Sequence, residues 1–102
     1  MQTELIPNPH AGETLREDFM KPLRLSQSEL AGHLGVSETA LADLVRGKRS
    51  LTPAMALRLS RYFGNSAEFW LGLQRDYDLM EARRKLEDRI ALRVQPRELV
   101  PA

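Results

Sequence analysis

The sequence predicts an all-α fold of five helices, the last of which is long and charged and leads into a tail. Three observations predict it. Serine and threonine residues stand where they can cap helix starts, glycine and proline residues stand where helices should end or begin, and apolar residues recur every three to four positions between them. At 102 residues the chain has the length of one domain with a modest core.

The strongest signals lie in residues 25 to 46, LSQSELAGHLGVSETALADLVR. Ser26 and Glu29 have the spacing of a capping box, which begins a helix. Gly35 suits the positive φ of a tight turn, and Ser37 then caps a second helix. Both helices have apolar faces, formed by Leu30, Ala31, Leu34, Ala40, Leu41, Leu44 and Val45. The segment predicts a helix-turn-helix, which places side chains in the major groove of DNA, although any helical hairpin shares some of these signals.

The part of the chain before this motif is predicted to contain an arm and one helix. Residues 1 to 9 hold two prolines in a polar context and are expected to be extended. A first helix is predicted from Gly12 to Lys21, and Pro22 is expected to end it. The apolar side of this helix is expected to consist of Leu15, Phe19 and the following Leu23.

Two more helices are predicted after the motif. Thr52 and Pro53 give a strong start signal for a helix that Gly64 ends. Ser66 begins the last helix, whose first half is apolar enough to pack on the core and whose second half is nearly all charge. From Val94 the tail is expected to form an edge strand or to stay disordered until it is bound. The expected division is an arm (1–9), a helix-turn-helix domain (10–75), and a C-terminal helix and tail (76–102) for dimerisation or partner contact.

The formal net charge is only +1, but the charges are unevenly distributed. Residues 1 to 43 carry three Lys or Arg and seven Asp or Glu, whereas residues 44 to 75 carry six against one. The cations follow the second motif helix closely, at Arg46, Lys48, Arg49, Arg58 and Arg61. This position favours contact with DNA phosphates over a merely solvated basic surface.

Several other classes of protein are disfavoured. The absence of cysteine excludes disulfides, thiol catalysis and the usual structural zinc sites. His10 and His33 lack companions at metal-binding spacings, so we expect no metal, no cofactor and no enzymatic activity. No run approaches the roughly 18 to 20 apolar residues of a membrane span, and we expect a cytoplasmic protein. Phe63, Phe69 and Trp70 have helical spacing, which favours the core over a stacking surface for single-stranded nucleic acid.

Two sets of side chains are assigned to DNA. The short or polar residues at the start of the second motif helix, or one turn on, are assigned to base edges: Ser37, Glu38, Thr39 and Asp43. Phosphate contacts are assigned to Gln27, Arg46, Lys48, Arg49 and Ser50. The two acidic residues of the first set also repel phosphate, so binding should depend strongly on the correct DNA sequence.

The last helix carries apolar residues beyond what a small core requires. Four of them are assigned to a homodimer interface: Leu73, Leu79, Met80 and Leu86. A two-fold dimer would place two recognition helices about 34 Å apart on a palindromic operator. The alternative is a solvated helix held by pairs such as Glu81 with Lys85.

Residues 25 to 49 resemble the helix-turn-helix of the Cro/C1-type (XRE) repressors, which have the lambda-repressor-like fold. A longer frame resembles the HigA-type antitoxins of bacterial toxin-antitoxin modules, through HAGETLREDF at 10–19, the motif itself, and LTPAMALRLSRYFGNSAEFWLGLQRDYDL at 51–79. The sequence departs from the family at residues 10 to 12, where His-Ala-Gly replaces the more usual His-Pro-Gly. No counterpart is evident after Arg84.

The resemblance implies an all-helical antitoxin that binds operator DNA, represses its own operon and neutralises a RelE-like (HigB-type) messenger-RNA endonuclease toxin. The residues themselves support only the DNA-binding part of this expectation. Two alternatives follow from them. One is a solitary XRE-type regulator without a toxin partner, and the other is a protein-interaction module that lacks DNA binding.

Overall fold

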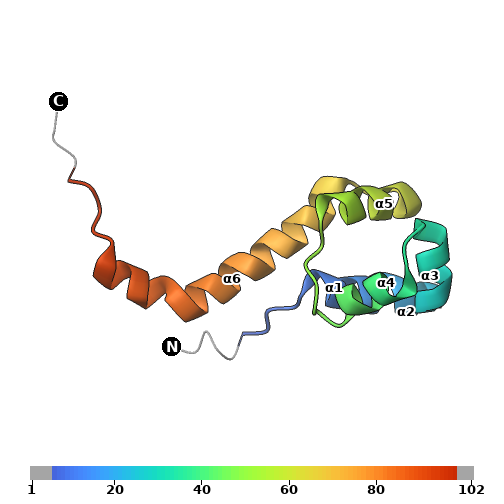
Figure 1. Ribbon diagram of the computed structural model, residues 1–102, viewed down its shortest axis with the longest axis horizontal. Coiled ribbons are helices and arrows are strands. Elements are labelled where there is room, and N and C mark those ends of the chain that lie inside the picture. The colour runs from blue at the N-terminus through green and yellow to red at the C-terminus, as the bar shows by residue number, and fades with distance from the viewer. Residues whose placement is uncertain (1–5, 99–102) are drawn as a thin grey trace.

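The computed structural model describes residues 6 to 98. The first helix consists of three consecutive segments, α1 (Ala11–Thr14), the π-helix η2 (Leu15–Met20) and α2 (Lys21–Leu23). It is followed by α3 (Gln27–Leu34), α4 (Glu38–Val45), α5 (Pro53–Phe63) and α6 (Ala67–Arg93) (Figure 1). The predicted all-α class with five helices is confirmed. Residues 94 to 98 have no regular secondary structure, and the remainder of the tail lies outside the described residues.

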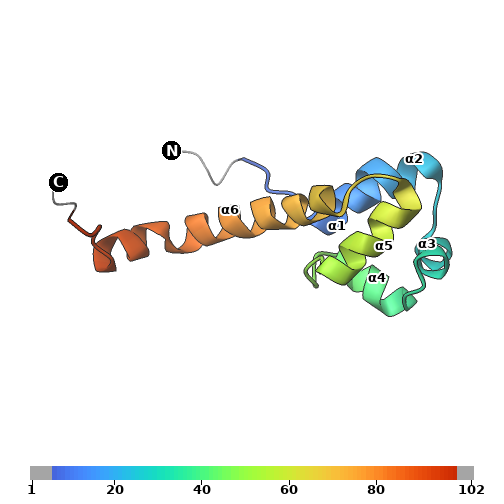
Figure 2. The same cartoon turned by 90° about the horizontal axis from the view of Figure 1, so that it is seen from above.

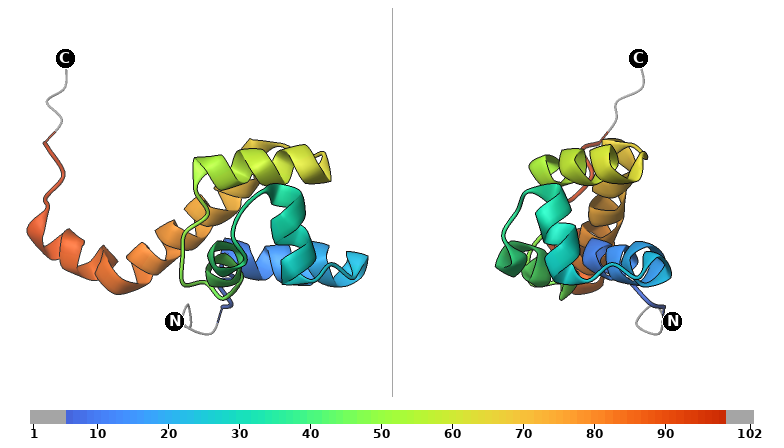
Figure 3. Two further views of the ribbon diagram at one scale, coloured as in Figure 1. Left: turned by 45° about the vertical axis from the view of Figure 1, so that its right-hand side comes forward. Right: turned by 90° about the vertical axis from the view of Figure 1, so that its right-hand side faces the viewer.

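The first four helices and the start of α6 form a head, and the rest of α6 projects from it (Figures 1 and 2). Figure 3 shows α5 and the start of α6 on one edge of the head and the first helix on the opposite edge. The radius of gyration is 17.6 Å, well above the value of about 13 Å expected for a compact chain of this length. The second half of α6 is therefore stabilised by few contacts with the head. Within residues 6–98, none of the helices is long and apolar enough to cross a bilayer.

Trp70 lies in the core of the head. Its ring is fully buried, and its Nε1 donates a hydrogen bond to the Asn65 side-chain oxygen at 2.7 Å. Phe63 packs against the same core, as expected. Phe69 was also expected there, but its side chain is 41% exposed because it points outward from the first turn of α6. The other large, fully buried side chains are Leu15, Leu30, Leu41, Leu44 and Leu59.

The first helix does not end at Pro22, contrary to the prediction. In η2 the backbone bonds reach one residue further than in an α-helix, and the Lys21 N–H donates to the Arg16 carbonyl. Regular α-helix resumes at Lys21, so Pro22 follows directly after the π-helix, in the last turn of the continuous first helix, and the N–H that it lacks leaves an upstream carbonyl without a helix bond. The helix ends one residue later, and Arg24 adopts a left-handed conformation (φ 55°). Leu23 is exposed rather than part of the apolar side.

Gly12 brings the first helix into direct backbone contact with α4. A Cβ atom at Gly12 would lie 1.7 Å from the Leu44 carbonyl oxygen and 3.0 Å from the Val45 Cα. No residue other than glycine fits this crossing unless the helices separate. The sequence identified Gly12 only as a helix start, because the other side of the contact is more than thirty residues away.

His10 caps the first helix and connects it to α6. Its Nδ1 accepts a hydrogen bond from the Gly12 N–H at 2.9 Å, and its ring packs edge-on against Tyr77 at 4.8 Å. The preceding arm also follows α6, because the Asn8 side chain donates to the Tyr77 carbonyl at 3.1 Å and to Glu81 at 3.0 Å. Burial lowers the pKa of His10, an effect that the nearby charges of Asp78 and Glu13 partly oppose.

We predict that Gly12→Ala destabilises the fold by about 1 to 3 kcal/mol or more, since the added methyl overlaps backbone atoms that cannot rotate away. The measurement is urea unfolding followed by circular dichroism. Gly32→Ala is the matched control, because a Cβ at Gly32 meets nothing within 4 Å and alanine favours the α3 helix. The control should gain up to about 1 kcal/mol. Equal stabilities for the two variants would contradict the close contact.

A second prediction concerns pH. The folded-state pKa of His10 lies below its unfolded value of about 6.5, so the unfolded chain binds more protons between the two values. The free energy of unfolding should therefore be highest above pH about 6.5 and fall as the pH drops toward the folded-state pKa. His10→Asn retains a helix-capping acceptor but does not titrate. Its stability should change less than that of the wild type in urea titrations between these pH values. A variant with the wild-type pH dependence would place the titrating group elsewhere.

Candidate nucleic-acid interface

The helix-turn-helix predicted from the sequence is formed by α3 and α4. Ser26 and Glu29 form both bonds of the capping box, each at 3.0 Å, and these hydrogen bonds lower the pKa of Glu29. Gly35 adopts a positive φ of 71°, as the turn requires. The Ser37 hydroxyl accepts the Ala40 N–H at 3.0 Å and caps α4. The signals were reliable because each depends on residues only a few positions apart.

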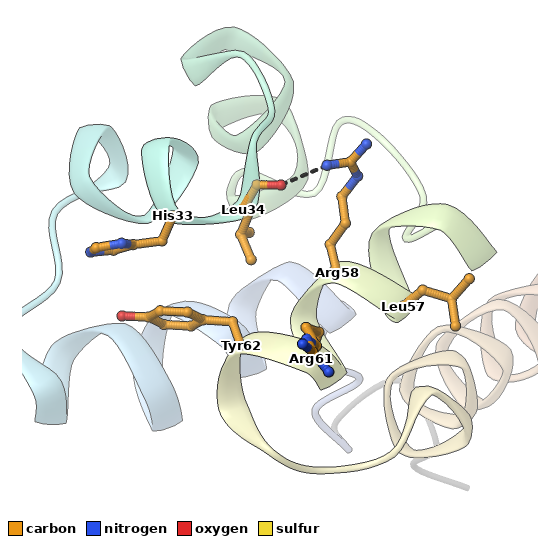
Figure 4. Close-up of a pocket in the computed structure, with 6 residues that line it drawn as sticks. All are labelled: His33, Leu34, Leu57, Arg58, Arg61 and Tyr62. Atoms are coloured by element: carbon orange, nitrogen blue, oxygen red, sulfur yellow. Dashed lines mark hydrogen bonds between the residues drawn. The ribbon is translucent and has the colours of Figure 1, made fainter.

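A contact from α5 holds the turn in place. Arg58 Nη1 donates to the Leu34 carbonyl at 2.7 Å (Figure 4). The same nitrogen donates to the Gly35 carbonyl at 3.4 Å. These carbonyls at the end of α3 would otherwise need water or another cap. The sequence grouped Arg58 with the cations that follow α4, whereas the structure gives its guanidinium a role in fixing the angle between the two motif helices.

The four side chains assigned to base edges lie on the outer side of α4. Ser37, Glu38 and Thr39 are exposed at its N-terminal end, and Asp43 is half-buried one turn further on. The opposite side of the helix is buried through Leu41, Leu44 and Val45. The Ser37 oxygen already accepts the capping bond, which leaves this hydroxyl its proton to donate and one further lone pair to accept with. The N-terminal half of α4 therefore presents donors, acceptors and a methyl group to solvent together.

The residues assigned to phosphates are arranged in two places. Gln27 is half-buried at the first position of α3. The other four, Arg46, Lys48, Arg49 and Ser50, lie together with Gly47 in an exposed segment directly after α4, residues 46 to 50, called the basic loop. The positive φ of Gly47 (76°) allows the chain to turn there, and the Lys48 N–H bonds back to the Asp43 carbonyl at 2.8 Å.

An ion pair joins the two sets of assigned residues. Arg49 lies 3.7 Å from the Asp43 carboxylate, and both side chains are partly exposed. Asp43 therefore repels nearby phosphates less than an isolated acid would, because the arginine balances its charge. The pair also restricts the position of Arg49 beside the outer face of α4. Nothing in the sequence spacing indicated this contact.

Sequence reasoning missed Gln74, which anchors the chain just after the basic loop. Its side-chain oxygen accepts the buried Leu51 N–H at 2.8 Å, and its side-chain nitrogen donates to Asp78 at 2.9 Å. Gln74 itself is buried against the head. The available signal was a polar residue one turn after Trp70, on the apolar face of the last helix. Such a residue, if buried, must find hydrogen-bond partners.

Two capped helices joined by a tight glycine turn, the second with a polar outer face and an exposed basic loop after it, make this a helix-turn-helix protein. Comparison with known proteins supports this class. The family pattern described as Helix-turn-helix matches residues 17 to 70. Virulence-associated protein I of Dichelobacter nodosus is 47% identical over 77 residues, which cover 76% of this chain and 71% of the relative. Antitoxin HigA-1 of Vibrio cholerae is 32% identical over 77 residues, which cover 76% and 72%.

A solved structure is also similar. It is the Pseudomonas aeruginosa antitoxin HigA with the higBA promoter, with a TM-score of 0.87 and 37% identity over 90% of this chain and 100% of that one. The chain belongs to the Cro/C1-type (XRE) helix-turn-helix family and to its HigA antitoxin group.

Proposed function

We propose that this protein is an antitoxin that binds its own operator as a homodimer, represses its operon and neutralises a HigB-type messenger-RNA endonuclease. One observation carries the proposal. The exposed outer face of α4 and the basic loop present polar and positively charged side chains together, in a chain 37% identical to an antitoxin whose structure includes the higBA promoter. Binding and repression require no catalytic group or cofactor, and they place the protein with DNA in the cytoplasm.

The proposed DNA contacts are of two chemical kinds, phosphate contacts and base contacts. Lys48, Arg49 and the other phosphate residues position the motif on the duplex without distinguishing sequences. Glu38 is suited to accept from a cytosine amino group, and the Thr39 methyl is suited to contact thymine. Asp43 acts mainly through its ion pair, by holding Arg49 next to the groove edge. The helix-turn-helix itself is rigid because Arg58 holds its turn.

The proposed dimer interface lies on α6. At 3.6 residues per turn, Trp70, Gln74 and Tyr77 share the face that contacts the head and the arm. The opposite face carries an apolar stripe whose members are 38% to 51% exposed: Leu79, Leu86 and Ile90. A second copy would cover this stripe. Met80, which was also assigned to the interface, is half-buried about 100° round the helix from Leu79, where it lines a hollow with Ile6 of the arm. Leu73, which was also assigned to the interface, lies on the head side and packs against the core.

The toxin partner rests on family membership and on the name of the Vibrio cholerae relative, which is an antitoxin. The Dichelobacter relative is more similar in sequence, and its name indicates virulence association rather than an antitoxin. A solitary regulator with the same DNA-binding surface is therefore the second candidate. Co-expression with the neighbouring gene distinguishes the two. The antitoxin proposal requires that the neighbouring product copurifies with this chain and is toxic without it.

The DNA-binding surface is tested by binding measurements at several salt concentrations. We predict that Lys48→Ala weakens binding to operator and random duplexes alike and flattens the log-log salt dependence by roughly one unit. Thr39→Ala and Glu38→Gln should instead act on particular operator positions, at about 1 to 3 kcal/mol each. Random-sequence affinity should stay level or rise for Glu38→Gln, since a negative charge near the phosphates is removed.

Lys85→Ala is the control for Lys48→Ala, because it removes one positive charge from α6, away from the proposed DNA-binding surface. The salt dependence of its DNA binding should keep the wild-type slope. An unchanged salt slope for Lys48→Ala would contradict the assignment of Lys48 to a phosphate contact. If Thr39→Ala and Glu38→Gln both kept the wild-type ranking of all single-base operator variants, the bases would be contacted by other residues.

The dimer interface is tested by charge substitution on α6. The double variant Leu79→Glu, Leu86→Glu should sediment as a folded monomer, because each glutamate would be buried without a partner in the interface. Its operator affinity should fall steeply, since the second half-site no longer contributes. Leu92→Glu replaces an exposed leucine on the other side of α6 and should remain dimeric. A dimeric double variant at micromolar concentration would place the interface elsewhere.

A further inference from the structure

One groove on the head is used by neither the proposed DNA contacts nor the proposed dimer interface. It lies between α3 and α5, has a volume of about 490 Å³, and is drawn in Figure 4. Its lining residues come from the end of α3 and the second half of α5: His33, Leu34, Leu57, Arg58, Arg61 and Tyr62. None of the six belongs to the residues assigned to base edges, to the basic loop or to the α6 stripe, although Arg58 and Arg61 are among the cations whose position in the sequence favours phosphate contact.

The groove is positively charged and contains no acidic side chain. Arg58 and Arg61 are one helical turn apart and exposed, and within residues 6–98 neither forms an ion pair. Arg58 uses one nitrogen for the turn carbonyls, which leaves its other donors available. A carboxylate or phosphate in the groove would gain charge-assisted hydrogen bonds that no described residue of the chain supplies.

The groove is also apolar and aromatic at its edges. Leu57 is 64% exposed, although it belongs to the head rather than to the projecting helix. Tyr62 is 40% exposed, and its ring stacks on His33 with a centroid distance of 5.1 Å and an interplanar angle of 16°. Figure 4 shows the stacked pair at one end of the groove and Leu57 at the other, with the arginines between them.

These two properties together select the class of ligand. A DNA backbone would satisfy the arginines, but its phosphates and sugars would leave Leu57 largely in water. A free anion would also satisfy the arginines and leave Leu57 largely in water. A peptide with carboxylates on either side of an apolar residue would satisfy both, because its acids reach the guanidinium groups while its apolar side chain covers Leu57.

We propose that this groove is a docking site for an acidic amphipathic segment of a partner protein. The carboxylates of that segment bind Arg61 and the remaining donors of Arg58, and its apolar side chains cover Leu57 and the exposed edge of Tyr62. Because the basic loop and the outer face of α4 lie outside the groove, the site adds a protein-binding surface to the DNA-binding one. It does not depend on the toxin or on the α6 stripe.

The test uses the full chain and the acetylated peptide Ala-Glu-Leu-Leu-Glu-Ala-Leu-Ala-Glu-Leu as the probe. Amide chemical shifts of the labelled protein should change at residues 33 to 36 and 57 to 62 on titration. Replacing each glutamate of the peptide with glutamine should weaken binding at least about tenfold, because the charge-assisted bonds are lost. Arg61→Glu should weaken it equally. Arg89→Glu makes the same charge change on α6, outside the groove, and should bind like the wild type. Arg58 is left intact because it holds the turn.

Three results would overturn the proposal. The first is no binding of the peptide, or shift changes confined to other residues. The second is a larger loss of random-DNA affinity in Arg61→Glu than in Arg89→Glu, which would make the groove a phosphate site. The third is concentration-dependent association of the wild type that Arg61→Glu abolishes in sedimentation, which would make a second copy of this chain the occupant.

Discussion

The contact between Gly12 and the end of α4 is the constraint on which the proposed DNA-binding surface depends. The two helix backbones touch, and a single Cβ atom would overlap the Leu44 carbonyl. The position of α4 is thereby set by backbone atoms, which cannot change rotamer as side chains do. The His10 cap starts the first helix two residues before this contact, and the same histidine ring lies beside Gly47 at the start of the basic loop. His10, Gly12, the end of α4 and the start of the basic loop therefore lie in contact with one another, next to the proposed DNA-binding surface.

The basic loop is attached at both ends. On the α4 side, the Lys48 N–H bonds to the Asp43 carbonyl at 2.8 Å, and on the α6 side the N–H of Leu51, the residue after the loop, bonds to the buried Gln74. A loop held in this way loses less conformational entropy when its cations meet phosphates than a free loop would. It also ties the DNA-binding surface to the segment of α6 that receives the arm through Asn8 and the ring of His10. A displacement of this segment of α6 would be transmitted to the loop through a buried hydrogen bond.

Much of the fold could be predicted because its signals are local. Ser26, Ser37, Thr52 and Ser66 each accept the N–H of the residue three positions later. The second motif helix, which carries the candidate site, was predicted for the same reason. The features that the sequence did not predict depend on distant partners or on a change of helix type: the backbone contact of Gly12, the turn-holding role of Arg58, the Gln74 anchor, and the π-helix that admits Pro22. The spacing of such residues in the sequence does not indicate which of them will be in contact in the folded chain.

The same reasoning explains why Leu73, one of the residues assigned to the proposed interface on α6, packs against the core instead. The apolar residues of α6 form two groups on opposite faces, and their spacing alone does not say which face meets the head. Leu73 belongs to the face of Trp70 and Gln74, so the core accounts for it. Leu79, Leu86 and Ile90 lie half a turn away, where the arm and the head do not reach. Because the arm follows the opposite face through Asn8 and Glu81, a second copy on this stripe leaves the arm contacts in place.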